Sequence, residues 1–430
     1  MKVLVLGSGA REHALVGSLV AEPGVTGVVC APGNPGIQRL VQTYPVDLGE
    51  PDALLTLATR EHIDLTVVGP ELPLSVGVAD RFAAAGRRLF GPTAAAARLE
   101  SSKAFAKAFM ARHQIPTARF HTSESLDAAM EVVRSGEFGV PVVLKADGLA
   151  AGKGVVIAAD RSAAEEALIA AMRDKRFGPA GDTVVIEECL SGPEVSFFVI
   201  SDGEHALPIG SAQDHKRIFD DDQGPNTGGM GAFAPSPLCD APLQARVMRE
   251  IVDPVIAGMA KEGHPFRGFL YVGLMLTATG PKVIEFNVRL GDPEAQVILP
   301  LVDEPLAPVL MAAAEGHLRQ STCRIGSDRV VGVVLASRGY PESSESGQPI
   351  SGIEQAERIP GVSVLHAATA MRNGQLVTAG GRVLTVVGRG PDFADAIARA
   401  YSGVLPIHFD GRQFRHDIGR KALVAESAGS

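Results

Sequence analysis

Short apolar runs and helical patterns alternate through the first hundred residues, and this alternation constrains the fold more than any other feature of the chain. Residues 3–6 form a continuous apolar run, which is followed by a Gly7-Ser8-Gly9 turn and a helical pattern over about residues 12–20. An apolar run that leads into a helix is typical of a parallel strand buried on both faces. The pattern recurs with apolar runs at 25–30, 65–68 and 88–90 and helical stretches at 51–61 and 76–85. It predicts a doubly wound α/β sheet over roughly residues 1–100.

A different pattern follows the Gly91-Pro92 turn. An alanine-rich helical stretch at 93–113, interrupted near 99–102, is expected to connect to a second unit. Strand patterns then occur at 140–145, 154–158, 184–188 and 195–201, with a helix at 163–173. Because neighbouring strands flank a glycine-rich turn, they predict an antiparallel α+β arrangement. From residue 330 strands recur, with Asn373-Gly374 predicted as a hairpin turn between 366–371 and 381–387, and a helix follows at 392–403.

Composition narrows the choice of partners. The chain has 430 residues, of which 46% are hydrophobic and 21% charged, as in a soluble globular protein of two to four domains. A formal net charge of −9 argues against broad attraction to nucleic acid or an anionic membrane, so we expect any phosphate ligand to be small. The four cysteines include no CxxC pair, and the N-terminus resembles neither a secretion signal nor a membrane anchor. We therefore expect a cytoplasmic protein.

The stretch KADGLAAGKG, residues 145–154, combines glycines and lysines without the Ser or Thr that ends a P-loop. It joins two predicted strands rather than a strand and a helix. Backbone amides at Gly148, Gly152 and Gly154 can therefore approach phosphate oxygens where a side chain would block them, while Lys145 supplies a positive charge. The alternative is a mobile hairpin with solvated lysines, and the turn chemistry of glycine favours neither interpretation.

Two strand patterns carry acidic and polar groups. In VVIEECLSGPE, residues 184–194, Glu187, Glu188 and Glu194 stand near a strand end, where acids and backbone can read a nucleoside or remain solvated. In KVIEFNVRLGD, residues 282–292, strand alternation places Glu285, Asn287 and Arg289 on one face. Carboxylate and amide oxygens suit Mg²⁺, although a half-solvated strand gives the same alternation.

Two glycine-rich loops are further candidates. GPNTGGMG, residues 224–231, is predicted as an irregular loop, and it follows QDHKR, residues 213–217, whose Asp214, His215 and Lys216 could orient a polar substrate. GSGAREH, residues 7–13, begins like a dinucleotide-binding turn, but Glu12 stands at the third glycine position. A turn before a helix still offers an anion site. Both loops also fit ordinary solvated surface segments.

In their order along the chain, these stretches resemble the phosphoribosylamine-glycine ligase (glycinamide ribonucleotide synthetase) family of ATP-grasp enzymes, which act in purine biosynthesis. The likeness extends from residue 1 to about 419. It is carried by VLGSGAREHAL, APGNPG, VVGPELPL, GPT, SSKAF, LKADGLAAGKGVV, QDHKR, GPNTGGMGA and VIEFNVRLGDPE. One such motif would be weak support, but the ordered set is specific.

The resemblance implies three domains: an N-terminal α/β substrate domain over 1–103, an ATP-grasp domain over 104–325 with a lid at about 120–193, and a small α+β domain over 326–425. It implies a ligase that joins glycine to 5-phosphoribosylamine through glycyl phosphate, consuming ATP with Mg²⁺ or Mn²⁺. The expected partners are these small molecules alone, without nucleic acid or membrane, and the expected state is a monomer.

The resemblance also assigns residues. Lys103, Lys145, Gly152 and Gly154 would contact ATP phosphates; Glu187, Glu188 and the Leu190 backbone would read adenine; and Glu194 would hold the ribose. Glu285 and Asn287 would bind the metal, and Arg289, Asp214 and Lys216 would be catalytic. Gly9, Arg11, Glu71, Asn226, Thr227, Gly228, Gly229, Asp292 and Arg382 would surround phosphoribosylamine. Ser8 and Ala10 depart from the family's frequent Asn and Gly, and the apolar GFLYVGLML segment lacks the additional metal carboxylate found in many ATP-grasp enzymes.

Three rival functions remain open from the sequence. Another ATP-grasp ligase, such as a carboxylase of a purine intermediate, would differ at QDHKR and GPNTGGMG. An NAD-dependent oxidoreductase is disfavoured by the broken glycine pattern. A nucleotide sensor would bind ATP without glycine-dependent release of ADP.

Overall fold

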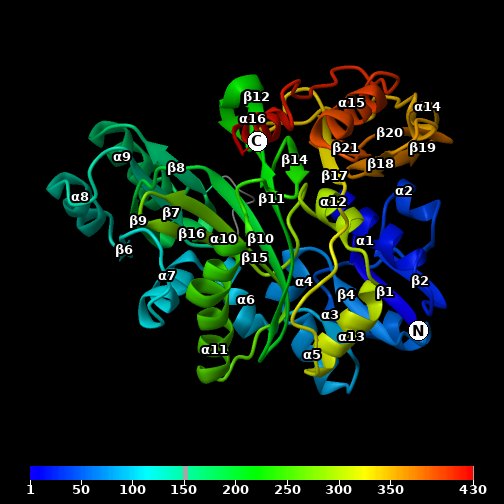
Figure 1. Ribbon diagram of the computed structural model, residues 1–430. Coiled ribbons are helices and arrows are strands. Elements are labelled where there is room, and N and C mark those ends of the chain that lie inside the picture. The colour runs from blue at the N-terminus through cyan, green and yellow to red at the C-terminus, as the bar shows by residue number, and fades with distance from the viewer. Residues whose placement is uncertain (149–153, 430) are drawn as a thin grey trace.

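The N-terminal part is a parallel sheet with helices on both faces, which confirms the doubly wound prediction (Figure 1). The computed structural model describes residues 1–148 and 154–429. Strand order is β3-β2-β1-β4-β5, with bounds β1 Lys2–Gly7, β2 Gly27–Pro32, β3 Gln42–Thr43, β4 Leu65–Val68 and β5 Leu89–Phe90. The helices are α1 Ala10–Val20, α2 Pro35–Gln38, α3 Pro51–Arg60, α4 Glu71–Ser75 and α5 Val78–Ala84. The first loop lies at the carboxyl end of β1, where open α/β sheets bind ligands.

Two helices connect this sheet to the middle of the chain, as the alanine-rich pattern predicts. They are α6, Ala94–Ser101, and α7, Lys103–Arg112. The break falls at Ser102, whose hydroxyl accepts a hydrogen bond from the Phe105 amide and so caps α7. The cap places Lys103 at the first turn of α7.

A small antiparallel sheet follows, with strand order β6-β9-β7-β8. Its strands are β6 Phe120–Ser123, β7 Val142–Ala146, β8 Val155–Ala158 and β9 Val184–Glu188, packed with α8 Leu126–Ser135 and α9 Arg161–Leu168. Val142, Leu144, Val184 and Ile186 contribute to its separate core. Polar Lys145 and Glu187 occupy the alternate positions, so the other face of this sheet carries the charged groups.

The central feature is an eight-stranded sheet in the order β16-β15-β10-β11-β14-β17-β21-β18. Its inner strands come from three separate parts of the chain (Figure 1). The bounds are β10 Glu194–Asp202, β11 Ala206–Asp214, β14 Gly231–Ala234, β15 Arg267–Thr277, β16 Gly280–Asn287, β17 Arg329–Ala336, β18 Val362–His366 and β21 Arg382–Gly390. The sheet thus joins the strand of the expected metal ligands to the C-terminal strands.

The remaining elements surround this sheet. Two short hairpins, β12 Arg217–Phe219 with β13 Gln223–Asn226 and β19 Thr369–Arg372 with β20 Gln375–Thr378, stand apart from it. The helices are α10 Ala241–Val247, α11 Asp253–Lys261, α12 Ala295–Ile298, α13 Leu306–Glu315, α14 Ile353–Glu357, α15 Phe393–Val404 and α16 Arg420–Gly429. Among the residues the structure describes, no helix is both long enough and apolar enough to cross a bilayer.

Two local predictions are wrong. Asn373 and Gly374, both at positive φ, do form a hairpin turn, but they join β19 to β20, whereas β21 pairs with β18. The error arises because Asn-Gly marks a turn without identifying which strands beyond it pair in the sheet. The GPNTGGMG stretch is also not irregular throughout, since residues 224–226 pair with β12 and Gly231 begins β14.

Candidate active site

Two lysines from different elements mark the first part of the site. Lys145 lies near the end of β7 and donates to the Ile284 carbonyl of β16 at 3.0 Å. Lys103 at the start of α7 donates to the Gly148 carbonyl at 3.0 Å, and burial lowers the pKa of its ammonium group. The Asp147 carboxylate accepts from the Ala104 amide at 3.0 Å. These contacts fasten the root of the predicted flap to the N-terminal end of α7.

Glu187 holds two lysines in the interior of the site. Its carboxylate lies 2.9 Å from Lys107 Nζ and 3.0 Å from Lys145 Nζ, and all three side chains are buried. Burial, followed by the nearby Lys145 charge, lowers the pKa of Lys107 to about 8, although Glu187 opposes the shift. A carboxylate between two ammonium groups leaves a net positive charge, which suits a polyphosphate ligand.

The predicted metal ligands lie beside these lysines on β16. Burial would raise the pKa of Glu285, but the charges of Lys216, Lys145 and Lys103 together lower it, so the carboxylate is ionised at neutral pH. Asn287 Oδ1 accepts from Arg289 at 3.1 Å. Among the described residues, this site included, no three His, Cys, Asp or Glu side chains form a metal-binding group. One carboxylate and one amide oxygen fit a hard cation that completes its shell with phosphate and water.

Arg289 connects this group to a second charged cluster. Its guanidinium lies 2.8 Å from Glu100 Oε1 and 3.5 Å from Glu71 Oε2. Arg289 and Arg11 both donate to the Leu290 carbonyl, at 3.2 and 3.0 Å. Two guanidinium groups on one carbonyl fix the end of β16 against the first loop, and each also pairs with a carboxylate, Arg11 with Glu12 at 2.6 Å and Arg289 with Glu100.

Arg382 brings the C-terminal strands to the same cluster. It donates to the backbone carbonyls of Gly228 and Asp292, and it lies 3.4 Å from the Asp292 carboxylate. Burial would raise the pKa of Asp292, but Arg382 and Arg11 lower it, so this carboxylate is also ionised. The loop at residues 226–229 is further held by hydrogen bonds from the Gly228 amide to the Tyr340 hydroxyl and from the Gly229 amide to Thr227 Oγ1.

A third group lies between the two clusters at the end of β11. Lys216 Nζ pairs with Glu194 at 2.6 Å, and although burial opposes the shift, the Asp214 and Glu194 charges raise its pKa well above the ordinary value. Burial, followed by the adjacent Asp214 charge, raises the pKa of Glu294 to about 7. Ser196 Oγ donates to Glu294 at 3.3 Å. The arrangement supplies a buried carboxyl group that exchanges a proton near neutral pH.

The structure thus brings together most, but not all, of the predicted residues. Glu188 is engaged elsewhere, paired with Arg119 at 2.9 Å and Lys282 at 3.3 Å. The Glu187 side chain is paired with two lysines, and its backbone lies in β9 between β6 and β7. Gly152 lies outside the described residues. The other predicted residues lie at the ends of helices and strands. Gly9 caps α1, Gly154 precedes β8, Leu190 follows β9, Asn226 ends β13 and Asp214 ends β11.

Sequence reasoning missed Lys107, Glu100, Ser196, Tyr271 and Glu294. Lys107 follows Lys103 by four positions on α7, a spacing that places both on one helix face and could have identified it. Glu294 lies in the quoted GDPE segment. Glu100, Ser196 and Tyr271 carry no comparable signal, because only the tertiary fold brings them to Arg289 and Glu294.

Comparisons with known proteins agree with this architecture. Three family models match in order: "Phosphoribosylglycinamide synthetase, N domain" at residues 1–100, its "ATP-grasp (A) domain" at 101–295 and its "C domain" at 330–421. The chain is 50% identical over 430 residues to phosphoribosylamine–glycine ligase of Xylella fastidiosa strain Temecula1, covering 99% of both chains. It is 48% identical to the enzyme of that name from Neisseria meningitidis serogroup A, covering 98% of this chain and 100% of the relative.

Solved structures give the same result. The crystal structure of phosphoribosylamine–glycine ligase from Thermotoga maritima matches with a TM-score of 0.85 and 34% identity, over 97% of this chain and 100% of that one. The biotin carboxylase domain of a Hydrogenobacter thermophilus 2-oxoglutarate carboxylase matches with a TM-score of 0.72 at 20% identity, over 96% and 91%. The second likeness concerns the fold alone.

Fold and site together define an ATP-grasp enzyme. Within that class, the chain belongs to the phosphoribosylglycinamide synthetase family, as the ordered motifs predict.

Proposed function

We propose that this protein ligates glycine to 5-phosphoribosylamine at the expense of ATP, giving glycinamide ribonucleotide, ADP and phosphate in purine biosynthesis. One observation carries the proposal to the level of residues: the hydrogen bond between Asn287 and Arg289 joins the lysine-rich cluster to the arginine-rich cluster. A triphosphate held at the first and a sugar phosphate held at the second would meet at this bond. The names of the relatives at about half identity agree with this reaction.

In the first step, a glycine carboxylate oxygen attacks the γ-phosphorus of ATP and the bond to the β–γ bridging oxygen breaks, giving glycyl phosphate and ADP. Lys145, Lys107 and Lys103 offset the charge on the phosphates, and Arg289 positions the glycine carboxylate. A divalent cation, Mg²⁺ or Mn²⁺, held by Glu285 and Asn287 would supply further charge neutralisation at the phosphate oxygens.

In the second step, the amine of phosphoribosylamine attacks the carbonyl carbon of glycyl phosphate, and inorganic phosphate leaves. Arg11 and Arg382 would hold the 5-phosphate from opposite sides, with Gly9 and residues 226–229 contributing backbone groups. The attacking amine gives up a proton, and Asp214 or Glu294 would receive it. Water must be excluded, and the lid expected at about residues 120–193, of which the flap at 145–154 is a part, would exclude it.

The remaining assignments concern the binding of the nucleoside, the oligomeric state and the cellular compartment. Residues 187–190 would read adenine through backbone groups, and Glu194 would hold the ribose hydroxyls once Lys216 releases it. Every residue named belongs to one chain, so the proposal requires only a monomer. The four cysteines are free thiols, which suits a reducing cytoplasm.

The decisive experiment is a coupled assay of ADP release with ATP, glycine or phosphoribosylamine omitted in turn. We expect activity only when all three are present with Mg²⁺. Release of ADP when bicarbonate replaces glycine would favour a carboxylase, and nucleotide binding without any turnover would favour a sensor; either outcome would overturn the proposal.

A further inference from the structure

The start of α1 is fastened to the C-terminal part of the chain by two buried polar side chains that no step above employs. They are Asn34, immediately before α2, and His13, in the second turn of α1; both are largely shielded from solvent. Their shared partner is the backbone of His366, the last residue of β18. These contacts connect the first loop, residues 8–11, to an element more than three hundred residues away.

Asn34 makes three hydrogen bonds with distinct consequences. Its Oδ1 accepts from the Ile37 amide at 2.9 Å and caps α2. Its Nδ2 donates at 2.8 Å to the carbonyl of Ser8 in the first loop, and also at 2.8 Å to the carbonyl of His366. The acceptor atom of this side chain therefore serves the helix, while the donor atom joins the loop to β18.

His13 makes the second connection. Its Nδ1 accepts from the His366 amide at 2.9 Å, and burial, followed by His366 and Arg39, lowers the pKa of His13 to about 3. The ring is therefore neutral and can accept through Nδ1. Gly36 allows this close approach, because a Cβ there would come within 2.5 Å of His13 and 2.6 Å of His366. The backbone N–H and the backbone carbonyl of His366 are thus both hydrogen-bonded to side chains from the N-terminal domain.

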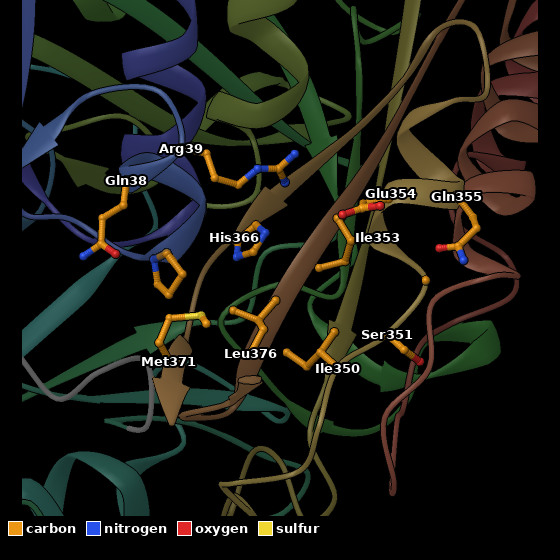
Figure 2. A pocket seen from close by; sticks show the side chains of 12 residues that line it. Gln38, Arg39, Ile350, Ser351, Ile353, Glu354, Gln355, His366, Met371 and Leu376 are labelled. Atoms are coloured by element: carbon orange, nitrogen blue, oxygen red, sulfur yellow. The ribbon is translucent and has the colours of Figure 1, made fainter. Parts of the chain in front are cut away.

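These bonds act beside other contacts between the two regions, namely the Arg39–Glu357 ion pair at 2.9 Å, the edge-to-face contact of the His13 and His366 rings, and the packing of Leu365 against the core that contains Ile37. A cavity of about 510 Å³ lies directly beside them, lined on one side by Gln38 and Arg39 and on the other by Leu376 and Met371 (Figure 2). The His366 ring also lines it, and its buried Nε2 lacks a hydrogen-bond partner. With open space on one side of the contact, the remaining packing would hold the first loop less firmly if the polar bonds were lost.

We propose that Asn34 and His13 are positioning residues for phosphoribosylamine: they hold the first loop, and with it Gly9 and Arg11, in place by anchoring it to the backbone of His366. The inference rests on the proposed function, which assigns the first loop to that substrate. It makes the C-terminal strand β18 part of the support of the substrate site through the backbone of His366.

The variant Asn34→Asp tests the donor atom alone. Aspartate keeps the oxygen that caps α2, but it places carboxylate oxygen against the carbonyls of Ser8 and His366. We expect the KM for phosphoribosylamine to rise by about tenfold or more, with KM for ATP and glycine and kcat within about threefold of the parent. A general loss of packing would instead raise the KM values of all three substrates and lower kcat.

A pair of variants at His13 supplies a rescue. Asparagine places an acceptor oxygen where His13 carries Nδ1, whereas leucine fills the space without an acceptor. We expect His13→Asn to retain most of the affinity for phosphoribosylamine and His13→Leu to lose about tenfold or more. The matched control is Met371→Ala, which alters an exposed side chain on the cavity wall without touching either bond.

The outcomes separate the two proposals. If the parent protein shows no glycine- and phosphoribosylamine-dependent ADP release, the proposed function fails. If the parent is active but Asn34→Asp and His13→Leu leave the KM for phosphoribosylamine unchanged, the function stands and the positioning role is wrong. Equal effects of His13→Asn and His13→Leu would also overturn it, because the acceptor would then be irrelevant.

Discussion

At the scale of single residues, the site is organised by unequal numbers of opposite charges in a buried space. Glu285 faces Lys216, Lys145 and Lys103, and their charges outweigh the effect of burial on its pKa. Lys145 and Lys216 also pair with Glu187 and Glu194, but a carboxylate that faces three ammonium groups is a natural place for a cation that also binds phosphate, since the cation and the lysines then share one polyanion. The charge of Glu285 is therefore expected to matter more to turnover than to folding.

We predict that Glu285→Gln lowers kcat about a hundredfold and raises the Mg²⁺ concentration needed for half-maximal rate, because one metal ligand loses its charge. A magnesium titration of the initial rate measures both effects. Glu315→Gln, which removes a surface carboxylate paired with Arg88, is the control. If the magnesium dependence of Glu285→Gln matches that of the parent, the metal assignment is wrong.

Glu294 yields a prediction about pH. Burial and the adjacent Asp214 raise its pKa to about 7, so the folded protein holds a proton that the unfolded chain releases above an ordinary value of 4.5. The contribution to stability is complete below pH 4.5 and is lost as the pH rises through 7. It amounts to about 3 kcal/mol at most. We expect Glu294→Gln to stabilise the protein relative to the parent increasingly between pH 4.5 and 7.5.

Calorimetric melting temperatures of both proteins across that pH range test this expectation. The difference should grow with pH, because glutamine carries no proton to lose. Parallel curves would mean that Glu294 does not titrate in this window.

At the scale of elements, β16 shows where a sequence pattern is sufficient and where it fails. Strict alternation predicts Ile284 on the buried face with Phe286, but the register with β15 shifts here, so that Gly273 pairs with Glu285 and Leu274 with Val283. Ile284 is the extra residue of a β-bulge, and its carbonyl accepts from Lys145. Alternation cannot reveal a bulge, because both neighbours of the extra residue remain compatible with a strand.

The hairpin of β12 and β13 yields another prediction at this scale. The fully buried Arg415 guanidinium binds Asp417 at 2.6 Å and Asp222 at 2.9 Å, and it donates to the Arg217 carbonyl at 3.1 Å. The C-terminal segment thus holds the hairpin that leads into residues 226–229. Removal of Arg415 leaves Asp222 with Lys421 and Asp417 with the Asp221 amide, and these remaining partners and the partial exposure of the carboxylates reduce the cost to about 2 kcal/mol.

We predict that Arg415→Met lowers the melting temperature and accelerates cleavage by trypsin after Lys216 or Arg217, identified by mass spectrometry. Arg420→Met is the matched control, because that exposed guanidinium lies 3.8 Å from its partner Asp221. Equal cleavage rates in the two variants would show that Arg415 does not anchor the hairpin.

At the scale of the whole molecule, the sequence predicts the units but not how they join. The parallel N-terminal sheet follows from local periodicity, and the candidate site follows from motifs that place Glu285, Asn287 and Lys145 on strands. The eight-stranded sheet does not follow, because pairing between β14 and β17 joins residues about a hundred positions apart. Pairing between distant segments leaves no periodic pattern in the sequence. For the same reason the sequence did not predict that Glu100 lies beside Arg289.

This sheet also contains a weaker junction, called the seam below, between β11 and β14, where the sequence shows no domain boundary. β14 pairs with β11 through only two positions, Gln213 with Phe233 and Asp214 with Ala232, but with β17 through four, from Gly231 with Val333 to Ala234 with Val330. Three backbone hydrogen bonds outside that ladder, between His215 and Gly231, Met230 and His215, and Ser236 and Ser211, also join the two segments. From the shorter regular ladder we nevertheless predict that β11 and β14 separate more readily than β14 and β17. The domain boundary predicted near residue 326 would then lie inside a unit that unfolds cooperatively and that contains β14 together with β17 and β21.

We predict that the amides of β14 exchange with solvent together with those of β17 and β21, and with a lower opening free energy than those of β10 and β15. Native-state hydrogen exchange resolved to single strands measures this, with the separate β19–β20 hairpin as a fast-exchanging reference. Because Asp214 lies on the seam, a bound triphosphate and sugar phosphate would bridge its two sides and should slow exchange in β14 more than in β10. If β14 instead exchanges with β10 and β11, the seam lies between β14 and β17, and the C-terminal strands form a unit that the substrates do not clamp through this edge.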